Sequence, residues 1–221
     1  MSVEQRYRLI YKPLVFVVCL LPLAWLLCGA FGLAGVSLGA DPVKKLEHEL
    51  GLRALQLLVL TLLITPLRHL LNLTHLPRLR RMLGLFAFSY ALLHFTVYLS
   101  LDLEFNFGTF FKDVAKRPYI TIGLLALLLL IPLAVTSTNK MMRRLGRRWQ
   151  KLHRLVYPIA ILGVWHFWWQ VKRDIREPLI YAGILAALLG YRIVRARLKA
   201  AKPKPTSITS TSGSATVPER T

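Results

Sequence analysis

The chain has 221 residues, 55% of them hydrophobic, and a formal net charge of +20. Several uninterrupted apolar runs of membrane-spanning length exclude an ordinary soluble domain. The basic residues lie in short clusters between these runs, as membrane topology signals do, and no basic stripe interleaved with aromatic residues indicates a nucleic-acid groove. The sequence therefore predicts an integral membrane protein that contacts lipid and no nucleic acid.

Six apolar segments are predicted to be membrane-spanning helices. The predicted fold class is accordingly an all-α integral membrane protein, a six-helix transmembrane bundle. One transmembrane domain is expected over residues 1–200, followed by a disordered Ser/Thr-rich cytoplasmic tail over 201–221, and no internal repeat is evident. The first segment is expected to remain as a membrane anchor rather than be cleaved as a signal peptide. The six segments are 14–36, 52–67, 83–101, 119–136, 152–170 and 178–194.

The lysines and arginines between these segments predict the orientation of the chain. With the N-terminus inside, the inner segments hold 21 basic and two acidic residues, whereas the outer segments hold nine basic and eight acidic residues. Because cytoplasmic loops carry the excess of positive charge, both termini are predicted to be cytoplasmic. This asymmetry accounts for most of the net charge. The inner segment Lys140–Lys151 could in addition contact a phosphate group.

Two histidines lie deep within predicted helices, where an ionisable side chain is costly and is by default a functional candidate. His94 follows Arg81 by thirteen residues, and His166 follows Arg154 by twelve. At about 1.5 Å per residue, both imidazoles are expected roughly 20 Å beyond the inner interface, at matching heights on parallel helices. Such a pair favours a bis-histidine haem site, with a hydrogen-bonded structural pair as the alternative.

His153 lies thirteen residues before His166, close to the inner interface, and the third predicted helix has no histidine at this height. The spacing leaves several roles open. His153 could bind a second haem with His69 or His75 as partner, bind a haem alone, contact a flavin or quinone, or form an interfacial hydrogen bond. His48, His69 and His75 are themselves expected to be solvated loop residues.

Aromatic residues cluster around His166 at the outer end of the fifth predicted helix. These residues are Trp165, Phe167, Trp168 and Trp169. Tryptophan is enriched at membrane–water interfaces, so the cluster is interpreted as an aromatic belt. The alternative interpretation is that the cluster forms one edge of a haem pocket.

Several motifs resemble the haem-binding subunits of the bacterial periplasmic methionine sulfoxide reductase system, the MsrQ family of the ferric-reductase-like transmembrane superfamily. One is Arg80-Arg-Met-Leu-Gly-Leu-x-x-Phe-x-Tyr-x-x-x-His94-x-x-x-Tyr98. A second comprises Thr136-Ser137 and Leu145-Gly-x-x-Trp149-x-x-Leu-His153-Arg-Leu-x-Tyr157, and ends at His166. Thr65-Pro-Leu-Arg68 fits as well, and the resemblance covers roughly residues 10–195.

The resemblance implies haem b and FMN as cofactors, with His94, His153 and His166 matching the haem histidines of the family. It implies electrons taken from the quinol pool or from a cytosolic flavin reductase. These electrons would pass to MsrP, a periplasmic molybdenum-containing subunit that reduces methionine sulfoxide in envelope proteins. The implied location is the bacterial inner membrane. The third predicted helix lacks the second histidine that the wider superfamily carries, which argues against a full two-haem stack.

The expected function is therefore a transmembrane electron conduit with no substrate chemistry of its own. One alternative is a stand-alone ferric reductase, which would reduce ferric chelates without a periplasmic partner. Another is a transporter or channel that uses the same histidines as a proton relay. The sequence favours neither alternative, because no acidic ladder crosses the membrane and no metal-binding loop faces outward.

Overall fold

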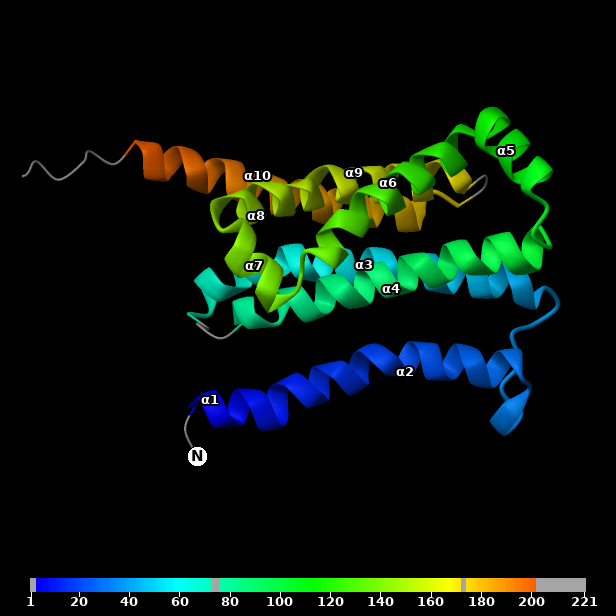
Figure 1. Cartoon of the computed structure of the whole chain (residues 1–221), viewed down its shortest axis with the longest axis horizontal. Coiled ribbons are helices and arrows are strands. Elements are labelled where there is room, and N and C mark those ends of the chain that lie inside the picture. Colours follow the sequence, from blue (N-terminus) through cyan, green and yellow to red (C-terminus); the bar gives the residue numbers. More distant parts are fainter. Residues whose placement is uncertain (1–2, 73–75, 172–173, 202–221) are drawn as a thin grey trace, which may run out of the picture.

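The computed structural model describes residues 3–72, 76–171 and 174–201, and these form helices and connecting turns without a strand (Figure 1). The predicted all-α fold is confirmed for this part of the chain. The tail predicted over 201–221 lies outside it except for Ala201. The division at residue 200 is therefore still a prediction.

The N-terminal helix is shorter than predicted. A short helix α1 (Val3–Arg6) and a π-helical turn (Tyr7–Tyr11) lead into α2 (Lys12–Ala30). The predicted segment continued to residue 36, but the chain leaves the helix after Ala30 because Gly32 has the left-handed φ of 64°. Glycine adopts this conformation without steric cost and commonly follows the last residue of a helix.

Helix α3 (Pro42–Leu70) begins ten residues before the predicted segment 52–67. The Asp41 side chain accepts a hydrogen bond of 3.2 Å from the Lys44 backbone N–H, and Pro42 occupies the first helical position, where it is well tolerated. Residues 42–51 therefore belong to the helix and not to an outer loop. This extension brings Glu47, His48 and Gly51 into the bundle.

The middle of the chain follows the prediction more closely. Helix α4 (Arg80–Val97) continues through a π-helical turn (Tyr98–Asp102), and α6 (Pro118–Val135) matches the predicted segment within one residue at each end. Between them, α5 (Phe107–Lys116) is a short helix that the sequence analysis did not predict. Its N-terminus is capped by Asn106, whose side-chain oxygen accepts from the Thr109 N–H at 2.9 Å.

The fifth predicted span is interrupted near its inner end. Two short helices, α7 (Asn139–Leu145) and α8 (Arg147–Leu152), and a 3-10 turn (His153–Leu155) precede α9 (Val156–Gln170). The last helix is α10 (Arg176–Ala200). At about 1.5 Å per residue, the 15 residues of α9 extend about 22 Å, less than the ~30 Å hydrocarbon core of a bilayer.

Five helical stretches among the described residues are long and apolar enough to cross a membrane. The α9 segment is not one of them, so the predicted count of six spans is not confirmed. The five stretches are Leu9–Ala30, Pro42–Leu70, Leu76–Asp102, Pro118–Val135 and Arg176–Leu198.

Two helix pairs form the centre of the bundle. Helix α3 packs along α4, α6 packs along α9, and α4 also contacts α6 (Figure 1). Helix α10 covers α9 and α3, while α2 lies on the far side of the α3–α4 pair. The most deeply buried side chains include Leu26, Leu62, Tyr90 and Ile159.

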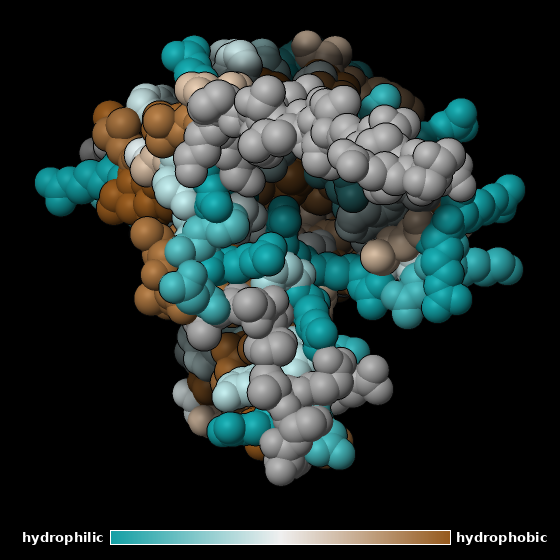
Figure 2. All heavy atoms as spheres, turned by 90° about the vertical axis from the view of Figure 1, so that its left-hand side faces the viewer, coloured by the Kyte–Doolittle hydropathy of each residue, from teal (hydrophilic) through white to brown (hydrophobic). Residues whose placement is uncertain are grey.

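One end of the bundle is strongly hydrophilic. Figure 2 views the end where α1, α7, α8 and the C-terminal end of α10 meet, and polar side chains cover much of it. The start of the chain and the end of α10 therefore share one end of the molecule, as the predicted topology requires. That this end faces the cytoplasm is still a prediction from charge.

The phenol of Tyr90 ties α2 to α4. Its hydroxyl donates to the Cys19 carbonyl oxygen at 2.7 Å and accepts from the Leu23 N–H at 3.1 Å. Only 1% of the Tyr90 side chain is exposed, so water cannot replace these bonds. The hydroxyl therefore fixes the otherwise lipid-exposed helix α2 against the bundle.

We expect Tyr90→Phe to lower the free energy of unfolding by about 1 kcal/mol, because the two buried hydrogen bonds that join α4 to the α2 backbone are lost. The measurement is unfolding by titration with a denaturing detergent, followed by circular dichroism. Ser89→Ala is the control, since that exposed hydroxyl bonds only within its own helix, to the Leu85 carbonyl. Equal stability of Tyr90→Phe and the wild type would contradict the tether.

Candidate functional site

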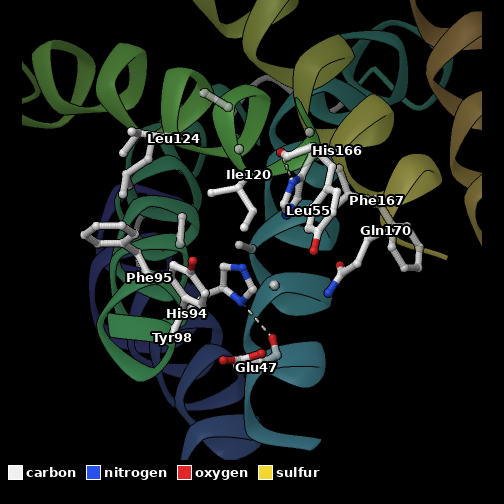
Figure 3. Close-up of a pocket in the computed structure, with 18 of the residues that line it drawn as sticks. Glu47, Leu55, His94, Phe95, Tyr98, Ile120, Leu124, His166, Phe167 and Gln170 are labelled. Carbon is white, nitrogen blue, oxygen red and sulfur yellow. Dashed lines mark hydrogen bonds between the residues drawn. The ribbon is translucent and has the colours of Figure 1, made fainter. Parts of the chain in front are cut away.

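A cavity of about 470 Å³ lies between α3, α4, α6 and α9. Figure 3 shows the imidazoles of His94 and His166 projecting into it from α4 and α9. Its residues come mainly from the N-terminal parts of α3 and α6 and from the C-terminal parts of α4 and α9. The cavity therefore lies toward the end of the bundle opposite α7 and α8.

Each of the two imidazoles is oriented by one hydrogen bond to the backbone of a neighbouring helix. His94 Nδ1 lies 2.8 Å from the Glu47 carbonyl oxygen, and His166 Nδ1 lies 2.7 Å from the Tyr119 carbonyl oxygen. A carbonyl oxygen only accepts, so Nδ1 must carry the proton in both rings. The lone pair of each neutral imidazole is then on Nε2, on the far side of the ring, which is the form that binds a metal.

Glycine makes both contacts possible. Gly51 follows Glu47 by four residues, and Gly123 follows Tyr119 by four, so each lies on the same helix face as the carbonyl acceptor. A Cβ on Gly51 would lie 3.2 Å from His94 Nδ1, and a Cβ on Gly123 would lie 2.8 Å from the His166 ring. A larger residue at Gly123 would displace the His166 ring, and one at Gly51 would require the His94 ring to shift by a few tenths of an ångström.

The spacing of the two rings suits one metal ion between them. Their centroids are 6.1 Å apart and their planes are inclined by 76°. In a five-membered ring with bonds near 1.35 Å, a nitrogen lies about 1.1 Å from the centroid. A metal–imidazole bond is about 2.0–2.1 Å, so two axial imidazoles on one ion require a centroid separation of about 6.3 Å. The structure thus brings the sequence-predicted pair together at a centroid separation close to this value.

The two halves of the site are repeated in the sequence. The acceptors Glu47 and Tyr119 are 72 positions apart, and the same interval separates Gly51 from Gly123 and His94 from His166. Helices α3 and α6 run in one direction, and α4 and α9 run in the other. The two helix pairs are therefore related by a rotation about an axis along the bundle, as in transporters built from parallel repeats.

The interval of 72 extends to almost the whole cavity wall and corrects the expectation that the chain has no internal repeat. Of the 27 lining residues, 24 form twelve pairs with this separation, and seven of these pairs are identical. The signal is weak in sequence because most matches are leucine, alanine or glycine within apolar runs. The identical pairs are Gly51 and Gly123, Leu52 and Leu124, Ala54 and Ala126, Leu55 and Leu127, Leu58 and Leu130, His94 and His166, and Phe95 and Phe167.

The cavity fits a flat apolar group that supplies most of the metal ligands itself. Within the described ranges, no three His, Cys, Asp or Glu side chains cluster as they would around a bare metal ion. Two opposed imidazoles above and below a porphyrin match the ligand set of a bis-histidine haem. Leucines and small residues such as Ala54, Ala91 and Gly163 line the walls and leave room for the ring.

Polar side chains lie at the mouth of the cavity, at the end of the bundle opposite α7 and α8. Lys44 and Arg117 reach it from the starts of α3 and α6, together with His48, Asp102 and Gln170. Glu47 Oε1 is buried there without a hydrogen-bond partner among the described residues. His48 was expected to be a solvated loop residue, and this was wrong: it is part of α3, lines the cavity and packs 6.0 Å from the Phe167 ring.

His153 lies apart from this pair, at the inner end of α9. Its Nδ1–H donates to the Trp149 carbonyl at 3.1 Å, its ring stacks on the Trp149 indole at 3.8 Å, and Nε2 is 3.4 Å from Ser137 Oγ. The position 72 residues earlier is Arg81, which bonds to Asn139 and Met142 in α7. No second histidine faces His153 among these contacts, so its role as a haem ligand stays a prediction.

The aromatic residues around His166 were interpreted either as an interfacial belt or as one edge of a haem pocket, and each interpretation fits some of them. Trp165, Trp168 and Trp169 are 51%, 40% and 48% exposed, as an interfacial belt requires, whereas Phe167 is buried and lines the cavity. His69 lies in the last turn of α3 and is exposed. His75 lies outside the described residues.

Comparison with known proteins identifies the family. The model of the ferric reductase like transmembrane component matches residues 50–164. The heme-binding subunit MsrQ of protein-methionine-sulfoxide reductase from Xanthomonas axonopodis pv. citri is 54% identical over 82% of this chain and 85% of its own length. MsrQ from Rhodospirillum rubrum is 53% identical over 82% and 86%. The chain belongs to the MsrQ family. No solved structure matches it.

Membership of the MsrQ family agrees with the architecture. A third member, from Xanthomonas campestris pv. campestris (strain 8004), is 60% identical over 71% of this chain. Together with five helices able to cross a membrane, these matches show that the protein is a multi-pass bacterial membrane protein. The family region contains Gly51, His94, Gly123 and His153, and it ends two residues before His166.

We expect ¹⁵N NMR of the cofactor-free protein to show His94 and His166 as neutral Nδ1–H tautomers. The reason is that each Nδ1 faces a carbonyl that can only accept. Signals are assigned by loss in His94→Gln and His166→Gln. Finding the proton on Nε2 in either ring would refute the proposed orientation.

Proposed function

We propose that the protein is the membrane electron-transfer subunit of a methionine sulfoxide reductase system, with one haem b held between His94 and His166. The observation that carries this proposal is the pair of imidazoles at a centroid distance of 6.1 Å, each with Nδ1–H fixed on a carbonyl. A bis-histidine haem supplies reversible one-electron oxidation and reduction with little ligand movement. The protein performs no substrate chemistry of its own.

Backbone carbonyls fix the orientation of both imidazoles. The Glu47 and Tyr119 carbonyl oxygens accept from the Nδ1–H groups of His94 and His166, so both rings would be held in place to bind a haem iron through Nε2. The leucine walls exclude water, which favours rapid electron transfer over proton exchange. The polar mouth at the outer end provides the route toward a periplasmic acceptor.

The donor and acceptor follow the resemblance to the family. Electrons would come from the quinol pool or a cytosolic flavin reductase and pass to the periplasmic molybdenum-containing subunit MsrP. This places the protein in the bacterial inner membrane with both termini in the cytoplasm, and the hydrophilic end of Figure 2 supports that orientation. The α7–α8 segment Lys140–Lys151 is the proposed contact for the FMN phosphate, because its arginines and lysines are suitable phosphate ligands.

For the outer site, we expect His94→Ala and His166→Ala each to abolish the low-spin haem absorption of the purified protein. The wild type should give a strongly anisotropic low-spin electron paramagnetic resonance signal, because ring planes inclined by 76° leave two iron orbitals nearly equal in energy. His48→Ala is the matched control, since its ring lines the same cavity without opposing another imidazole. A His94→Ala protein with full haem content would overturn the site.

The stoichiometry of the same samples tests His153. Two haems per chain in the wild type, and one in His153→Ala, would support a second site. One haem per chain in both proteins would assign His153 to the hydrogen bonds with Trp149 and Ser137 instead.

Reconstitution distinguishes the electron conduit from its alternatives. Proteoliposomes supplied with quinol or flavin reductase should reduce MsrP in a manner that depends on His94. Turnover of ferric chelates without MsrP would favour the stand-alone ferric reductase. A colourless protein that conducts protons would favour the histidine relay.

Two cations at the outer mouth are suited to the haem propionates. Lys44 in α3 and Arg117, just before α6, line the mouth of the cavity, where they also form ion pairs with Asp41 and Asp113. The interval of 72 relates their neighbourhoods, since Lys45 corresponds to Arg117 and Lys44 to Lys116. An approximate twofold rotation relates the α3–α4 pair to the α6–α9 pair. Applied to a haem bound between the two histidines, this rotation would exchange the two faces of the haem and also its two propionates. We infer that one cation serves each propionate.

We expect Lys44→Gln and Arg117→Gln each to lower the midpoint potential by on the order of 1 kcal/mol, about 40 mV, because a nearby positive charge stabilises the reduced haem. Redox titration of the purified protein measures this shift. Arg176→Gln is the control, because this outer cation at the start of α10 does not line the cavity. Unchanged potentials in both variants would count against the assignment.

A further inference from the structure

Helix α5 lies at the same end of the bundle as the mouth of the histidine cavity, the cavity between His94 and His166. Figure 1 shows it beyond the start of α6 and turned out of line with α4. It belongs to the link 103–117, which joins two stretches long enough to cross a membrane, Leu76–Asp102 and Pro118–Val135. Because the link begins and ends where a spanning stretch ends, α5 lies at the boundary of the bilayer.

One face of α5 is joined to the bundle. Asp113 is buried and accepts a hydrogen bond from the Tyr98 hydroxyl at 2.9 Å, and its other carboxylate oxygen lies 3.3 Å from Arg117 Nε. The Phe110 ring packs edge-on against the Phe95 ring of α4, with their centroids 6.0 Å apart. Tyr98, Phe95 and Arg117 also line the histidine cavity. These contacts fix the rotation of α5 about its own axis.

The exposed side chains of α5 are sorted into an apolar face and a basic face. Phe107 and Phe111 are four residues apart, so they share one side of the helix, and they are 57% and 67% exposed. Lys112 and Lys116 are also exposed and four residues apart, and Lys112 lies about 100° around the helix from Phe111. Aromatic residues on one side and lysines beside them are typical of a helix that lies in a membrane surface.

The turn before α5 holds a third exposed phenylalanine in a strained conformation. Glu104 and Phe105 have φ angles of 47° and 59°, in the left-handed region that bulky residues rarely adopt. The turn is held by backbone bonds from Phe105 N–H to the Leu99 carbonyl at 2.9 Å and from Asn106 N–H to the Leu103 carbonyl at 2.8 Å. The Phe105 side chain is 58% exposed, so burial in the bundle does not account for a phenylalanine at this position.

Two observations favour lipid as the molecule that covers these rings. Trp165, Trp168 and Trp169 are exposed near the end of α9, at the same end of the bundle, where tryptophan marks the membrane–water boundary. The only acid of α5, Asp113, is paired with Arg117, so the exposed charge of the helix is positive. Positive charge beside an apolar face complements the phosphates of anionic phospholipids.

We propose that α5 is an interfacial anchor, whose exposed phenylalanines insert into the lipid surface at the end of the bundle opposite α7 and α8, and whose two lysines face the lipid phosphates. Because Asp113 joins α5 to Tyr98 and Arg117, the anchor also holds two residues of the cavity mouth at a fixed depth in the membrane. The inference goes beyond the proposed function and does not depend on which cofactor occupies the histidine cavity.

The test is spin labelling of the full chain in nanodiscs of phosphatidylethanolamine and phosphatidylglycerol, with the two native cysteines replaced by alanine. A nitroxide is attached at Phe107→Cys or Phe111→Cys, and in the matched controls at Lys112→Cys or Lys116→Cys. Power saturation compares collisions with oxygen, which concentrates in lipid, and with a water-soluble nickel chelate. We expect oxygen collisions to exceed nickel collisions at the phenylalanine positions, and the order to be reversed at the lysine positions.

A second variant tests the phenylalanines as a group. Phe105→Ser and Phe107→Ser, introduced together into the chain labelled at Phe111→Cys, should raise nickel collisions, with circular dichroism confirming an unchanged helix content. Unchanged collisions in this variant, or an excess of nickel collisions at all four labelled positions, would overturn the lipid anchor. A label at Phe111→Cys that contacts the nickel chelate and is immobilised only when MsrP is added would also overturn it, because the apolar face would then belong to a protein partner.

Discussion

The bond from an imidazole Nδ1–H to a helix carbonyl is the contact on which the rest of the histidine cavity depends. It occurs twice, from His94 to Glu47 and from His166 to Tyr119, and each time a glycine four residues after the acceptor leaves the carbonyl accessible. A carbonyl oxygen inside a helix has a second lone pair, so it can accept from the imidazole without losing its helical partner. The bond fixes tautomer and ring plane together.

The approximate twofold relation explains why the histidine cavity lies near one end of the bundle. From Glu47 to Leu58 in α3, and from Tyr119 to Leu130 in α6, every lining position has a lining counterpart 72 residues away, and five of the seven pairs are identical. Toward the inner end they diverge, since α3 continues through Pro66 to Leu70 whereas α6 ends at Val135. A ligand that needs equivalent contacts on both faces therefore finds them at the end of the bundle opposite α7 and α8.

The sequence predicted the pairing of His94 and His166 because depth along a spanning helix follows from residue counts and flanking charges. It did not predict the acceptors Glu47 and Tyr119, because a backbone carbonyl has no residue signature. Asp41 and Pro42 did carry a visible start signal for α3, and its use would have placed His48 in the bundle. The interval of 72 was hidden by leucine-rich composition and became evident only once two equivalent contacts were known.

The divergence at the inner end also accounts for His153. Its counterpart in the repeat is Arg81, which is bonded to Asn139 and Met142 of α7, while His153 itself stacks on Trp149 and bonds to the Trp149 carbonyl. The outer histidines face an open cavity with their free nitrogen, whereas His153 Nε2 faces the Ser137 hydroxyl, which already donates to the Leu133 carbonyl at 2.7 Å. Binding of iron by His153 would therefore need only a shift away from Ser137, but the second axial ligand would have to come from something other than an imidazole at the equivalent position.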